Sequence, residues 1–367
     1  MSIYVGTNKI KSIYHGLTKI KSVYVGTVKV FSALPSFSRT ITLSIARSYA
    51  TGGSIGNYAL FVGGVIPKDS ETADTIDRVD AYNTSLVRST APAITNKSAN
   101  LSSANVGDYA LFAGGFGYNA SGNSRSRSSV YAYNSSLVRS SADSLTESVR
   151  YLAGASNNYA IFGGGEIEIS NSSGTSYTSC VDAYNSSLVK SEAIRLHIGK
   201  SRLAAASIGE YVIFAGGSRP SSGSQNIAEA YNNSLVKATI TSLAYARQGM
   251  GGASTDTHAI FGGDTSRAID AYNASLVRTT PTNSSVQRRR YASVSTPNGV
   301  FFAGGDNLTN VIELYDKFLT RNTIDSLSIG RQALEGTVVG KYILFGGGST
   351  GNFITESLTN IIDVFEL

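Results

Sequence analysis

The sequence predicts an all-β protein built from one small unit that is repeated seven times. The first observation is a pair of glycines that recurs every 42 to 53 residues, each time after an aromatic and aliphatic run. The second is an Ala-Tyr-Asn motif that follows five of these pairs. A motif copied at such a period marks a supersecondary unit that repeats around a ring or along a stack. The glycine pairs are Gly63-Gly64, Gly114-Gly115, Gly163-Gly164, Gly216-Gly217, Gly262-Gly263, Gly304-Gly305 and Gly346-Gly347.

The composition agrees with a β protein that has many turns and polar loops. The chain has 367 residues, of which 38 are glycine and only 15% are charged, with a formal net charge of +6. No run of Lys and Arg indicates a nucleic-acid partner or a polybasic contact with a membrane. The single cysteine, Cys180, excludes an intrachain disulfide framework. We expect it to be a small residue that enters a strand.

Each repeat is expected to form four short antiparallel strands, as the second copy illustrates. Residues 101–104 and 109–113 have the pattern of two apolar strands joined by a turn. After a polar loop come strands at 130–133 and 137–140, with a tight turn at Asn134. The second strand is apolar at successive positions, so both of its faces must be covered. Four-stranded sheets that pack against neighbours around an axis provide that cover.

The two ends of the repeat region are expected to close a ring. The seventh repeat stops after its third strand, at residues 362–367, and lacks an outer strand. Upstream of the first repeat, residues 36–40 align with the outer strand at 85–89. We therefore predict that a strand at 36–43 completes the seventh sheet and leaves the ring without open ends. The ring then spans residues 34–367.

The repeat resembles the Kelch repeat of β-propellers, in which one strand ends in a glycine pair and a later strand carries a tyrosine. The resemblance covers about residues 36–367. It departs in one respect, because the chain has no tryptophan at all and Leu-Val pairs such as Leu86-Val87 stand in its place. The predicted fold class is therefore all-β, a seven-bladed Kelch-like β-propeller with a small N-terminal β-repeat module.

Residues 1–33 contain a second repeat, of ten residues, whose three copies are β-prone runs broken by a glycine. They resemble the N-terminal segments of tail and baseplate structural proteins from phages of Gram-positive bacteria. The resemblance implies an anchor that contacts other virion proteins through Tyr4, Tyr14 and Tyr24, and that joins copies of the chain into a homo-oligomer. A cap that docks on the propeller rim is the alternative interpretation.

Antiparallel geometry assigns the connections to two faces of the ring. The links from second to third strand, and from fourth strand to the next repeat, lie on one side, which we call the loop face. The tight hairpins lie on the opposite side, the hairpin face. A strand that begins near Ser36 begins on the hairpin face, so we expect residues 1–33 to leave the ring there.

A basic residue precedes the first strand of every repeat, a region that resembles the mouth of the central channel in Kelch propellers. In a structural interpretation, these side chains bond to neighbouring backbone carbonyls. In a functional one, they form a ring of guanidinium donors for a carboxylate or phosphate ligand, since arginine presents a bidentate fork. The seven are Arg47, Lys97, Arg150, Arg202, Arg247, Arg290 and Arg331.

Loops on the same face add further candidates for contact with a ligand. The longest are residues 116–129 and 166–179, which are rich in serine, asparagine and glycine. Recognition residues often lie on such loops when a rigid scaffold holds them, and disordered polar loops are the alternative. The loop-face candidates are Tyr118, Arg125, Arg127, Tyr177, Arg219 and Arg267.

Two short motifs match those of enzymes in their letters, but the structure expected around them does not suit catalysis. The run from Gly52 to Gly56 matches a nucleophile elbow in letters, but it falls near a hairpin turn where no helix is expected. A phosphate loop that ends at Gly199-Lys200-Ser201 would need a glycine at position 194, which is Ile194. The three histidines share no spacing that would suit a metal. We therefore predict no catalytic residues, no metal and no cofactor.

The sequence favours a non-enzymatic structural protein of a phage virion, attached to its tail, its baseplate or its capsid. It would display the propeller for binding or decoration at the host surface, with a glycan or a protein as ligand. No stretch has the pattern of a signal peptide or a membrane span, so we expect synthesis in the host cytoplasm and no membrane insertion. The alternative is an intracellular Kelch-type scaffold that binds an acidic protein segment through the arginines at the channel mouth.

Overall fold

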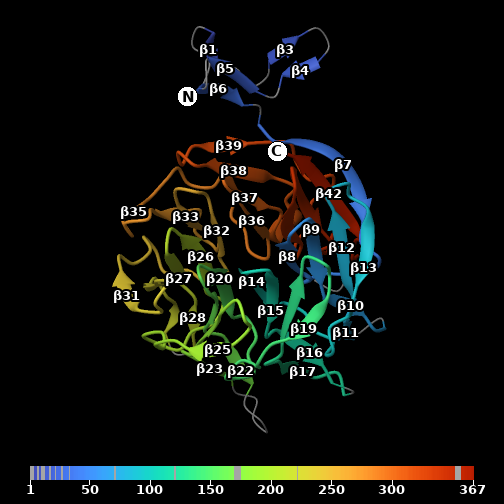
Figure 1. The fold of residues 1–367 in the computed structure, drawn as a ribbon, viewed down its shortest axis with the longest axis vertical. Coiled ribbons are helices and arrows are strands. Elements are labelled where there is room, and N and C mark those ends of the chain that lie inside the picture. Colours follow the sequence, from blue (N-terminus) through green and yellow to red (C-terminus); the bar gives the residue numbers. More distant parts are fainter. Residues whose placement is uncertain are drawn as a thin grey trace.

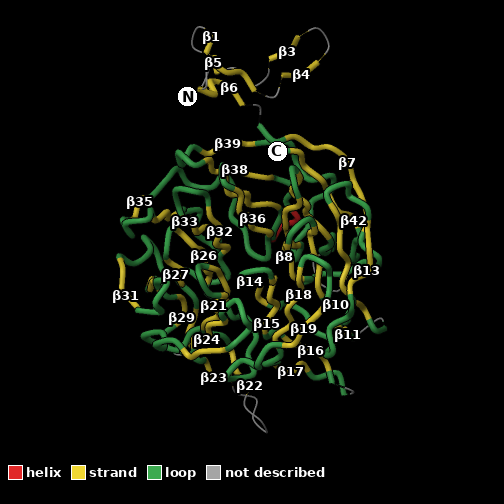
Figure 2. Tube along the Cα trace, viewed as in Figure 1, coloured by secondary structure: helices red, strands yellow, loops and turns green. Residues whose placement is uncertain are grey.

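The structure is a computed structural model that describes residues 34–367, except 70–71, 120, 169–174, 221 and 352–356, and the backbone of short strands within residues 1–33. Figure 1 shows a ring of small sheets that includes β7 (Ser36–Thr42) and β39 (Arg321–Thr323), with the N-terminal strands outside the ring. Figure 2 shows strands and loops throughout the ring. In the described part, the helical content is the single turn η1 (Asp306–Leu308).

Seven four-stranded antiparallel sheets form the blades of a β-propeller. Blade 1 contains β8 (Thr51–Ile55), β9 (Tyr58–Val62), β12 (Val79–Asn83) and β13 (Arg88–Ala91), and blade 2 contains β14 (Ser102–Val106), β15 (Tyr109–Ala113), β18 (Val130–Asn134) and β19 (Arg139–Ser141). Blade 3 contains β20 (Ala153–Ser156), β21 (Ala160–Gly163), β24 (Val181–Tyr184) and β25 (Lys190–Glu192), and blade 4 contains β26 (Ala204–Ile208), β27 (Tyr211–Ala215), β30 (Ala228–Tyr231) and β31 (Lys237–Ile240).

The remaining three blades keep the same strand order from the axis to the rim. Blade 5 contains β32 (Gly251–Ser254), β33 (Ala259–Gly262), β34 (Asp270–Tyr272) and β35 (Arg278–Thr279). Blade 6 contains β36 (Ala292–Thr296), β37 (Gly299–Ala303), β38 (Ile312–Asp316) and β39. Blade 7 contains β40 (Glu335–Val339), β41 (Tyr342–Gly346), β42 (Ile361–Glu366) and, as its outer strand, β7. The predicted all-β propeller with seven blades is confirmed.

The seventh blade brings the two ends of the ring together. β7 runs antiparallel to β42, with Ser36 opposite Glu366 and Thr42 opposite Ile361. This pairing gives β42 a neighbour on each side, so the blade does not end on an unpaired third strand. Glu366 also pairs with Tyr342, which follows the hairpin turn between β40 and β41. Ser36 therefore lies on the hairpin face.

Residues 1–33 contain three two-stranded hairpins, one for each copy of the ten-residue repeat. In each hairpin a tyrosine stands opposite a lysine, namely Tyr4 opposite Lys9, Tyr14 opposite Lys19 and Tyr24 opposite Lys29. The side chains of these tyrosines lie outside the described part of the structure. A two-stranded hairpin by itself is marginally stable in water, so this module depends on further packing. The strands are β1 (Tyr4–Val5), β2 (Asn8–Lys9), β3 (Ile13–His15), β4 (Thr18–Ile20), β5 (Ser22–Val25) and β6 (Val28–Ser32).

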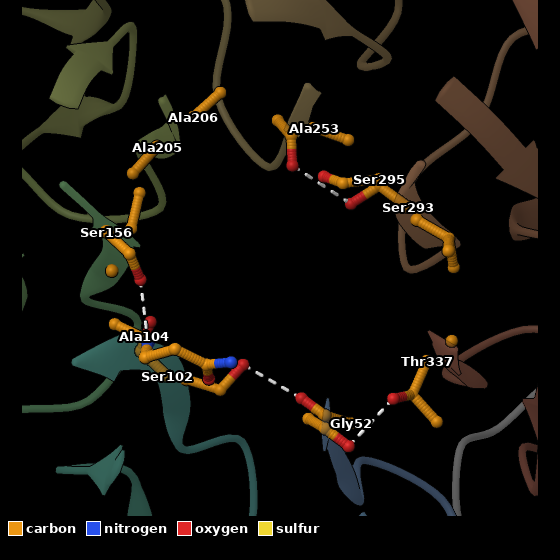
Figure 3. Close-up of a pocket in the computed structure, with 18 of the residues that line it drawn as sticks. Gly52, Ser102, Ala104, Ser156, Ala205, Ala206, Ala253, Ser293, Ser295 and Thr337 are labelled. Carbon is orange, nitrogen blue, oxygen red and sulfur yellow. Dashed lines mark hydrogen bonds between the residues drawn. The ribbon is translucent and has the colours of Figure 1, made fainter. Parts of the chain in front are cut away.

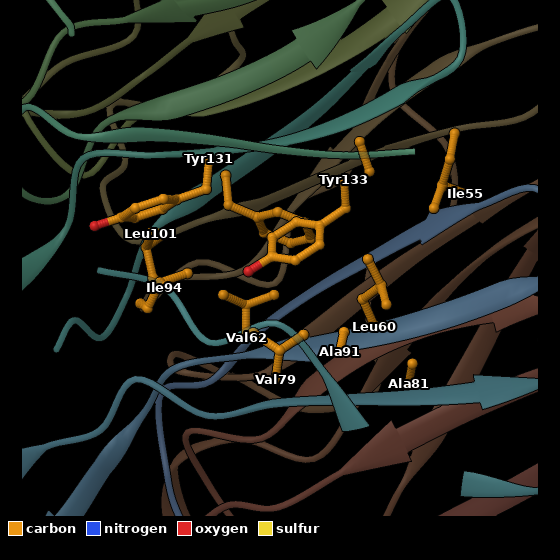
Figure 4. Close-up of a cluster of buried hydrophobic side chains, with 12 residues drawn as sticks. Ile55, Leu60, Val62, Val79, Ala81, Ala91, Ile94, Leu101, Tyr131 and Tyr133 are labelled. Atoms are coloured by element: carbon orange, nitrogen blue, oxygen red, sulfur yellow. The ribbon is translucent and has the colours of Figure 1, made fainter. Parts of the chain in front are cut away.

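The hydrophobic core consists of layers between neighbouring blades. In Figure 4, Tyr133 of blade 2 lies over Leu60 and Val79 of blade 1. In every blade, an aromatic residue on the second strand meets one on the third with their ring centroids 5.8 to 6.1 Å apart. The hydroxyl of Tyr133 also donates to the carbonyl of Pro92, in the link from the previous blade, at 2.7 Å. The recurring tyrosine therefore contributes both apolar area and a hydrogen bond.

The glycine pairs join each blade to the next one. The N–H of Gly217 in blade 4 donates to the carbonyl of Arg247 in blade 5 at 2.8 Å, and Gly305 and Arg331 repeat the contact at 2.9 Å. Gly217 has a φ of +103°, and a Cβ there would lie 2.9 Å from the carbonyl oxygen of Ser201, so glycine is required. In blades 3, 5 and 7, the pair with positive φ lies one residue later than predicted, at Gly164-Gly165, Gly263-Asp264 and Gly347-Gly348.

We expect a truncation that removes β7 to destabilise the ring. Deletion of residues 1–42 leaves β42 as an unpaired edge and uncovers Val364 and Phe365, which are fully buried. Thermal unfolding should then begin several degrees lower, on the order of 5 °C or more. Deletion of residues 1–33 keeps β7 and should leave the unfolding temperature close to that of the full chain. Equal unfolding temperatures for the two truncations would contradict the closing role of β7.

Candidate functional site

Three of the seven predicted basic residues are fully buried in ion pairs inside their blades. The pairs are Arg47–Asp80, Arg247–Asp270 and Arg331–Asp363. Arg331 illustrates the geometry, because its Nη1 lies 2.8 Å from Asp363 Oδ2 and its Nη2 donates to the carbonyl of Phe345 at 3.0 Å. Burial lowers the pKa of all three arginines, and the paired carboxylates oppose this change. Their arrangement matches the structural interpretation, and a ligand at the surface does not reach them.

Two further blades carry a buried cation four residues before their first strand, and the sequence analysis did not identify it. The Lys200 Nζ lies 3.6 Å from Glu229 Oε2 in blade 4, and the Arg288 Nη2 lies 2.9 Å from Glu313 Oε2 in blade 6. The sequence analysis named Arg202 and Arg290 in these two blades, because each is also basic and stands two residues after the buried cation. In both blades the acidic partner stands two positions before the recurring tyrosine, as Glu229 does before Tyr231 and Glu313 before Tyr315.

The predicted ring of seven basic residues therefore does not exist as one set of equivalent positions. Blades 2 and 3 have Ser98 and Val149 where the other blades have the buried cation. Lys97 is exposed and pairs with Asp74, with 2.9 Å between the Lys97 Nζ and the Asp74 Oδ2. Arg150, Arg202 and Arg290 lie elsewhere on the loop face.

Two residues beyond the buried position, one residue from each blade joins a ring around the axis on the loop face. All seven have left-handed backbone with φ between +50° and +62°. The N–H of Arg202 donates to the carbonyl of Tyr151 at 2.9 Å, and the N–H of Tyr49 donates to that of Ala333 at 3.0 Å. Residues other than glycine rarely adopt this backbone conformation, and those that do are often found at functional sites. We call this set the mouth ring, and it comprises Tyr49, Asn100, Tyr151, Arg202, Gly249, Arg290 and Ala333.

Four side chains of the mouth ring, from Tyr49, Tyr151, Arg202 and Arg290, form a group that we call the mouth cluster. The Arg202 guanidinium lies over the Tyr151 ring, 4.7 Å from its centroid. Burial raises the pKa of Tyr49 to about 12, while the positive charges of Arg290 and Arg202 oppose the rise. These charges therefore lie close enough to the Tyr49 hydroxyl to affect it. Sequence reasoning found the two arginines and missed the two tyrosines.

The two cations of the mouth cluster are exposed and weakly compensated. Arg290 is half exposed, with its Nη1 3.8 Å from Asp306 Oδ1. Arg202 is exposed, and no carboxylate oxygen in the described part of the chain lies within 4.0 Å of its nitrogens. Arg150 differs, because its Nη2 lies 2.5 Å from Glu166 Oε1 and its Nη1 donates to Ser124 Oγ at 2.8 Å.

Short hairpins on blades 1 to 4 rise beside the mouth ring, and we call them the loop-face wall. The hairpins of blades 1 to 3 are linked, since Arg125 forms an ion pair with Glu168 and the N–H of Tyr118 donates to Thr75 Oγ1 at 3.4 Å. Blades 5 to 7 show no such paired strands among their described residues. The wall consists of β10 (Val65–Pro67), β11 (Ala73–Thr75), β16 (Phe116–Tyr118), β17 (Ser124–Ser126), β22 (Glu166–Glu168), β23 (Thr175–Tyr177), β28 (Ser218–Arg219) and β29 (Gly223–Ser224).

The predicted loop-face residues are distributed over this wall and beyond it. Tyr118, Arg125, Tyr177 and Arg219 stand on its strands, and Arg127 directly follows β17. Burial raises the pKa of the Tyr118 hydroxyl, and Tyr151 of the mouth cluster adds to the rise. Arg267 is exposed in blade 5 and donates to the carbonyl of Ser285 at 3.4 Å. The structure therefore brings Tyr118 near the mouth cluster and places Arg267 in a blade without a wall hairpin.

Along the axis lies a cavity of about 460 Å³ that the first strands of all seven blades line. Figure 3 shows its wall of small side chains, including Ser102, Ser156 and Ser295. Many wall hydroxyls are engaged between blades, as Thr337 Oγ1 is when it donates to the carbonyl of Gly53 at 2.7 Å. Among the described lining residues, Glu335 is the one ionisable side chain, and burial raises its pKa to about 8.

The described residues contain no group of three or more His, Cys, Asp or Glu side chains placed to hold a metal ion. Nor does any described helix have the length and apolar character that a membrane crossing requires. The prediction that the protein has no cofactor stays a prediction.

Comparison with known proteins identifies the chain as a seven-bladed β-propeller. No protein-family model and no curated protein matches the sequence. Matching solved structures include 626 chains, so the fold is shared by many proteins. The structure of YjhT is similar over 89% of this chain and 99% of that chain, with a TM-score of 0.55 and 11% sequence identity. At this identity the likeness shows the fold alone, and neither the Kelch type nor a function follows from it.

We expect removal of one partner of a buried ion pair to destabilise the protein strongly. The variant Asp270→Ala leaves the buried Arg247 without its carboxylate, which should cost about 3–5 kcal/mol in the free energy of unfolding. Denaturant unfolding measures this change. The matched control is Asp74→Ala, since the partner of Asp74 is the exposed Lys97, and it should cost about 1 kcal/mol or less. Similar costs for both variants would rule out the structural role of the buried pair.

The channel carboxyl predicts a specific dependence of stability on pH. The pKa of Glu335 is about 8 in the folded chain, above its ordinary value of 4.5. The folded state therefore binds this proton more tightly, so its stabilising contribution is complete below about pH 4.5 and is lost as the pH rises through 8. Unfolding temperatures measured from pH 5 to 9 should fall more steeply for the natural chain than for Glu335→Gln. Parallel curves would contradict the raised pKa.

Proposed function

We propose that this protein is a non-enzymatic structural component of a phage virion, in its tail, its baseplate or its capsid. In this role it displays a propeller for binding at the host surface. The observation that carries the proposal is the separation of two parts on opposite faces. Residues 1–33 join the ring at Ser36 on the hairpin face, and the loop-face wall and the mouth cluster lie on the other.

The repeat at residues 1–33 supports attachment to a larger assembly. Its three hairpins carry tyrosine and lysine at the same paired positions, and they remain separate two-stranded sheets. Isolated hairpins gain stability when another surface covers them, which other virion proteins or further copies of this chain would provide. The resemblance of these repeats to tail and baseplate proteins favours a phage particle as that assembly.

A second candidate is an intracellular scaffold that binds an acidic protein segment. The observation that favours it is the exposed Arg202, which has no carboxylate partner in the described chain. This role requires no anchor, so it leaves the repeated hairpins of residues 1–33 without a purpose. We therefore rank it second.

The proposal predicts that the chain is a constituent of intact particles. Particles purified from the source organism by density gradient should contain it when their proteins are identified by mass spectrometry. A chain that lacks residues 1–33 should keep its folded propeller and be absent from the same particles. Absence of the full chain from particles, or incorporation of the shortened chain, would argue against the role given to residues 1–33.

A further inference from the structure

We propose that the mouth cluster binds a saccharide that carries a carboxylate or phosphate group, with Arg202 and Arg290 holding the anion, Tyr151 supporting Arg202 and Tyr49 packing on the sugar ring. The inference rests on the proposed function only for the source of the ligand, which would be the host surface. The site itself is defined by residues of this chain alone.

The cationic half of the site is prepared for an anion because its two guanidinium groups are only weakly engaged inside the protein. The carboxylates around the mouth are mostly engaged with other arginines, since Glu166 pairs with Arg150 and Asp264 pairs with Arg289. Arg202 contacts the face of Tyr151 and no described carboxylate. A guanidinium in this state offers its planar donors to a carboxylate or phosphate without first breaking an ion pair.

The remaining acidic residue near the mouth, Asp306, leaves Arg290 available. It lies 3.8 Å from the Arg290 Nη1, beyond hydrogen-bond distance, and burial raises its pKa. Arg290 also donates to Gln332 Oε1 at 3.3 Å, a long bond that an anion could replace. Both cations of the cluster therefore have donor capacity on the exposed side of the mouth.

The aromatic half of the site suits a sugar better than an extended acidic peptide. Tyr49 and Tyr151 are half-buried, and the guanidinium groups of Arg202 and Arg150 lie 4.7 and 5.6 Å from the centroid of the Tyr151 ring. Tyr151 therefore supports these cations, and Tyr49 offers the aromatic face to a sugar. Aromatic faces pack against the C–H groups of a sugar ring, while a phenol that stays protonated can donate and accept hydrogen bonds. With a pKa near 12, the Tyr49 hydroxyl stays protonated at neutral pH and adds no repulsion toward an anion.

The backbone of the mouth ring keeps this arrangement rigid. The carbonyl of Tyr151 accepts the N–H of Arg202, and the carbonyl of Arg202 accepts the N–H of Gly249 at 2.8 Å. On the other side, Ala333 donates to the carbonyl of Arg290 at 2.6 Å. A backbone that is already fixed by these bonds loses little freedom when a ligand arrives, and this preorganisation favours binding.

The test is binding of the full chain to an array in which each uronic-acid saccharide and each sugar phosphate is paired with its neutral counterpart. We expect retention of at least one anionic member over its counterpart, and the two anionic arms distinguish carboxylate from phosphate. For the bound member, calorimetry should show an affinity loss of about 10-fold or more for Arg202→Gln and for Arg290→Gln. Tyr151→Leu should also weaken binding, because it removes the ring against which the Arg202 guanidinium lies.

The matched control is Lys341→Gln, which removes one exposed positive charge on the hairpin face and should leave the affinity unchanged. Unfolding temperatures of all variants verify that each one is folded. Equal retention of charged and neutral saccharides, or an equal loss in Lys341→Gln, would overturn the inference. So would binding of a poly-glutamate peptide in the absence of any saccharide binding. Each of these results leaves particle incorporation, which tests the proposed function, unaffected.

Discussion

The buried ion pair before the first strand is the interaction on which the rest of the propeller depends. At this position, the side chain of Arg331 pairs with Asp363 inside its own blade, and its backbone carbonyl accepts the N–H of Gly305 from the blade before. The same residue therefore fixes the third strand of its own blade and the spacing to a neighbour. A buried charge that loses its partner is costly. Any shift that separates the cation from the third strand therefore removes much of the stability of the blade. Five of the seven blades use this device.

The mouth cluster inherits its geometry from that position. Each mouth-ring residue follows by two positions the residue that is the paired cation in five blades and Ser98 or Val149 in blades 2 and 3. The inter-blade hydrogen bonds of Tyr49 and Arg202 then join neighbouring residues of the mouth ring. This arrangement explains how bulky residues are kept in a backbone region that they rarely adopt, because the surrounding ring over-determines them. A rigid scaffold of this kind leaves the variable hairpins free to differ from blade to blade.

The sequence predicted the architecture well because the repeat consists largely of residues that favour one local conformation. The glycine pairs, the turn asparagines and the paired aromatic residues each require one local structure, and seven copies reinforce one another. The site was harder to predict, because Lys200 and Arg202 are equally basic and only their different burial separates their roles. Spacing drifts by one or two residues between repeats, as at Gly164-Gly165, and such a drift moves a side chain from the interior to the mouth. Nothing in the sequence distinguished Tyr49 and Tyr151 from the other tyrosines, since the chain is rich in tyrosine.

The pairing of β7 with β42 also constrains when the protein can complete its structure. These strands are separated by almost the whole ring in sequence, so the contact between them has one of the largest loop-closure costs in the molecule. During synthesis, the early strand must remain without its partner while all the intervening blades emerge from the ribosome. The ring therefore closes only after β42 has been made. An incomplete product would keep an exposed strand edge, by which quality-control factors could recognise it before it enters any assembly.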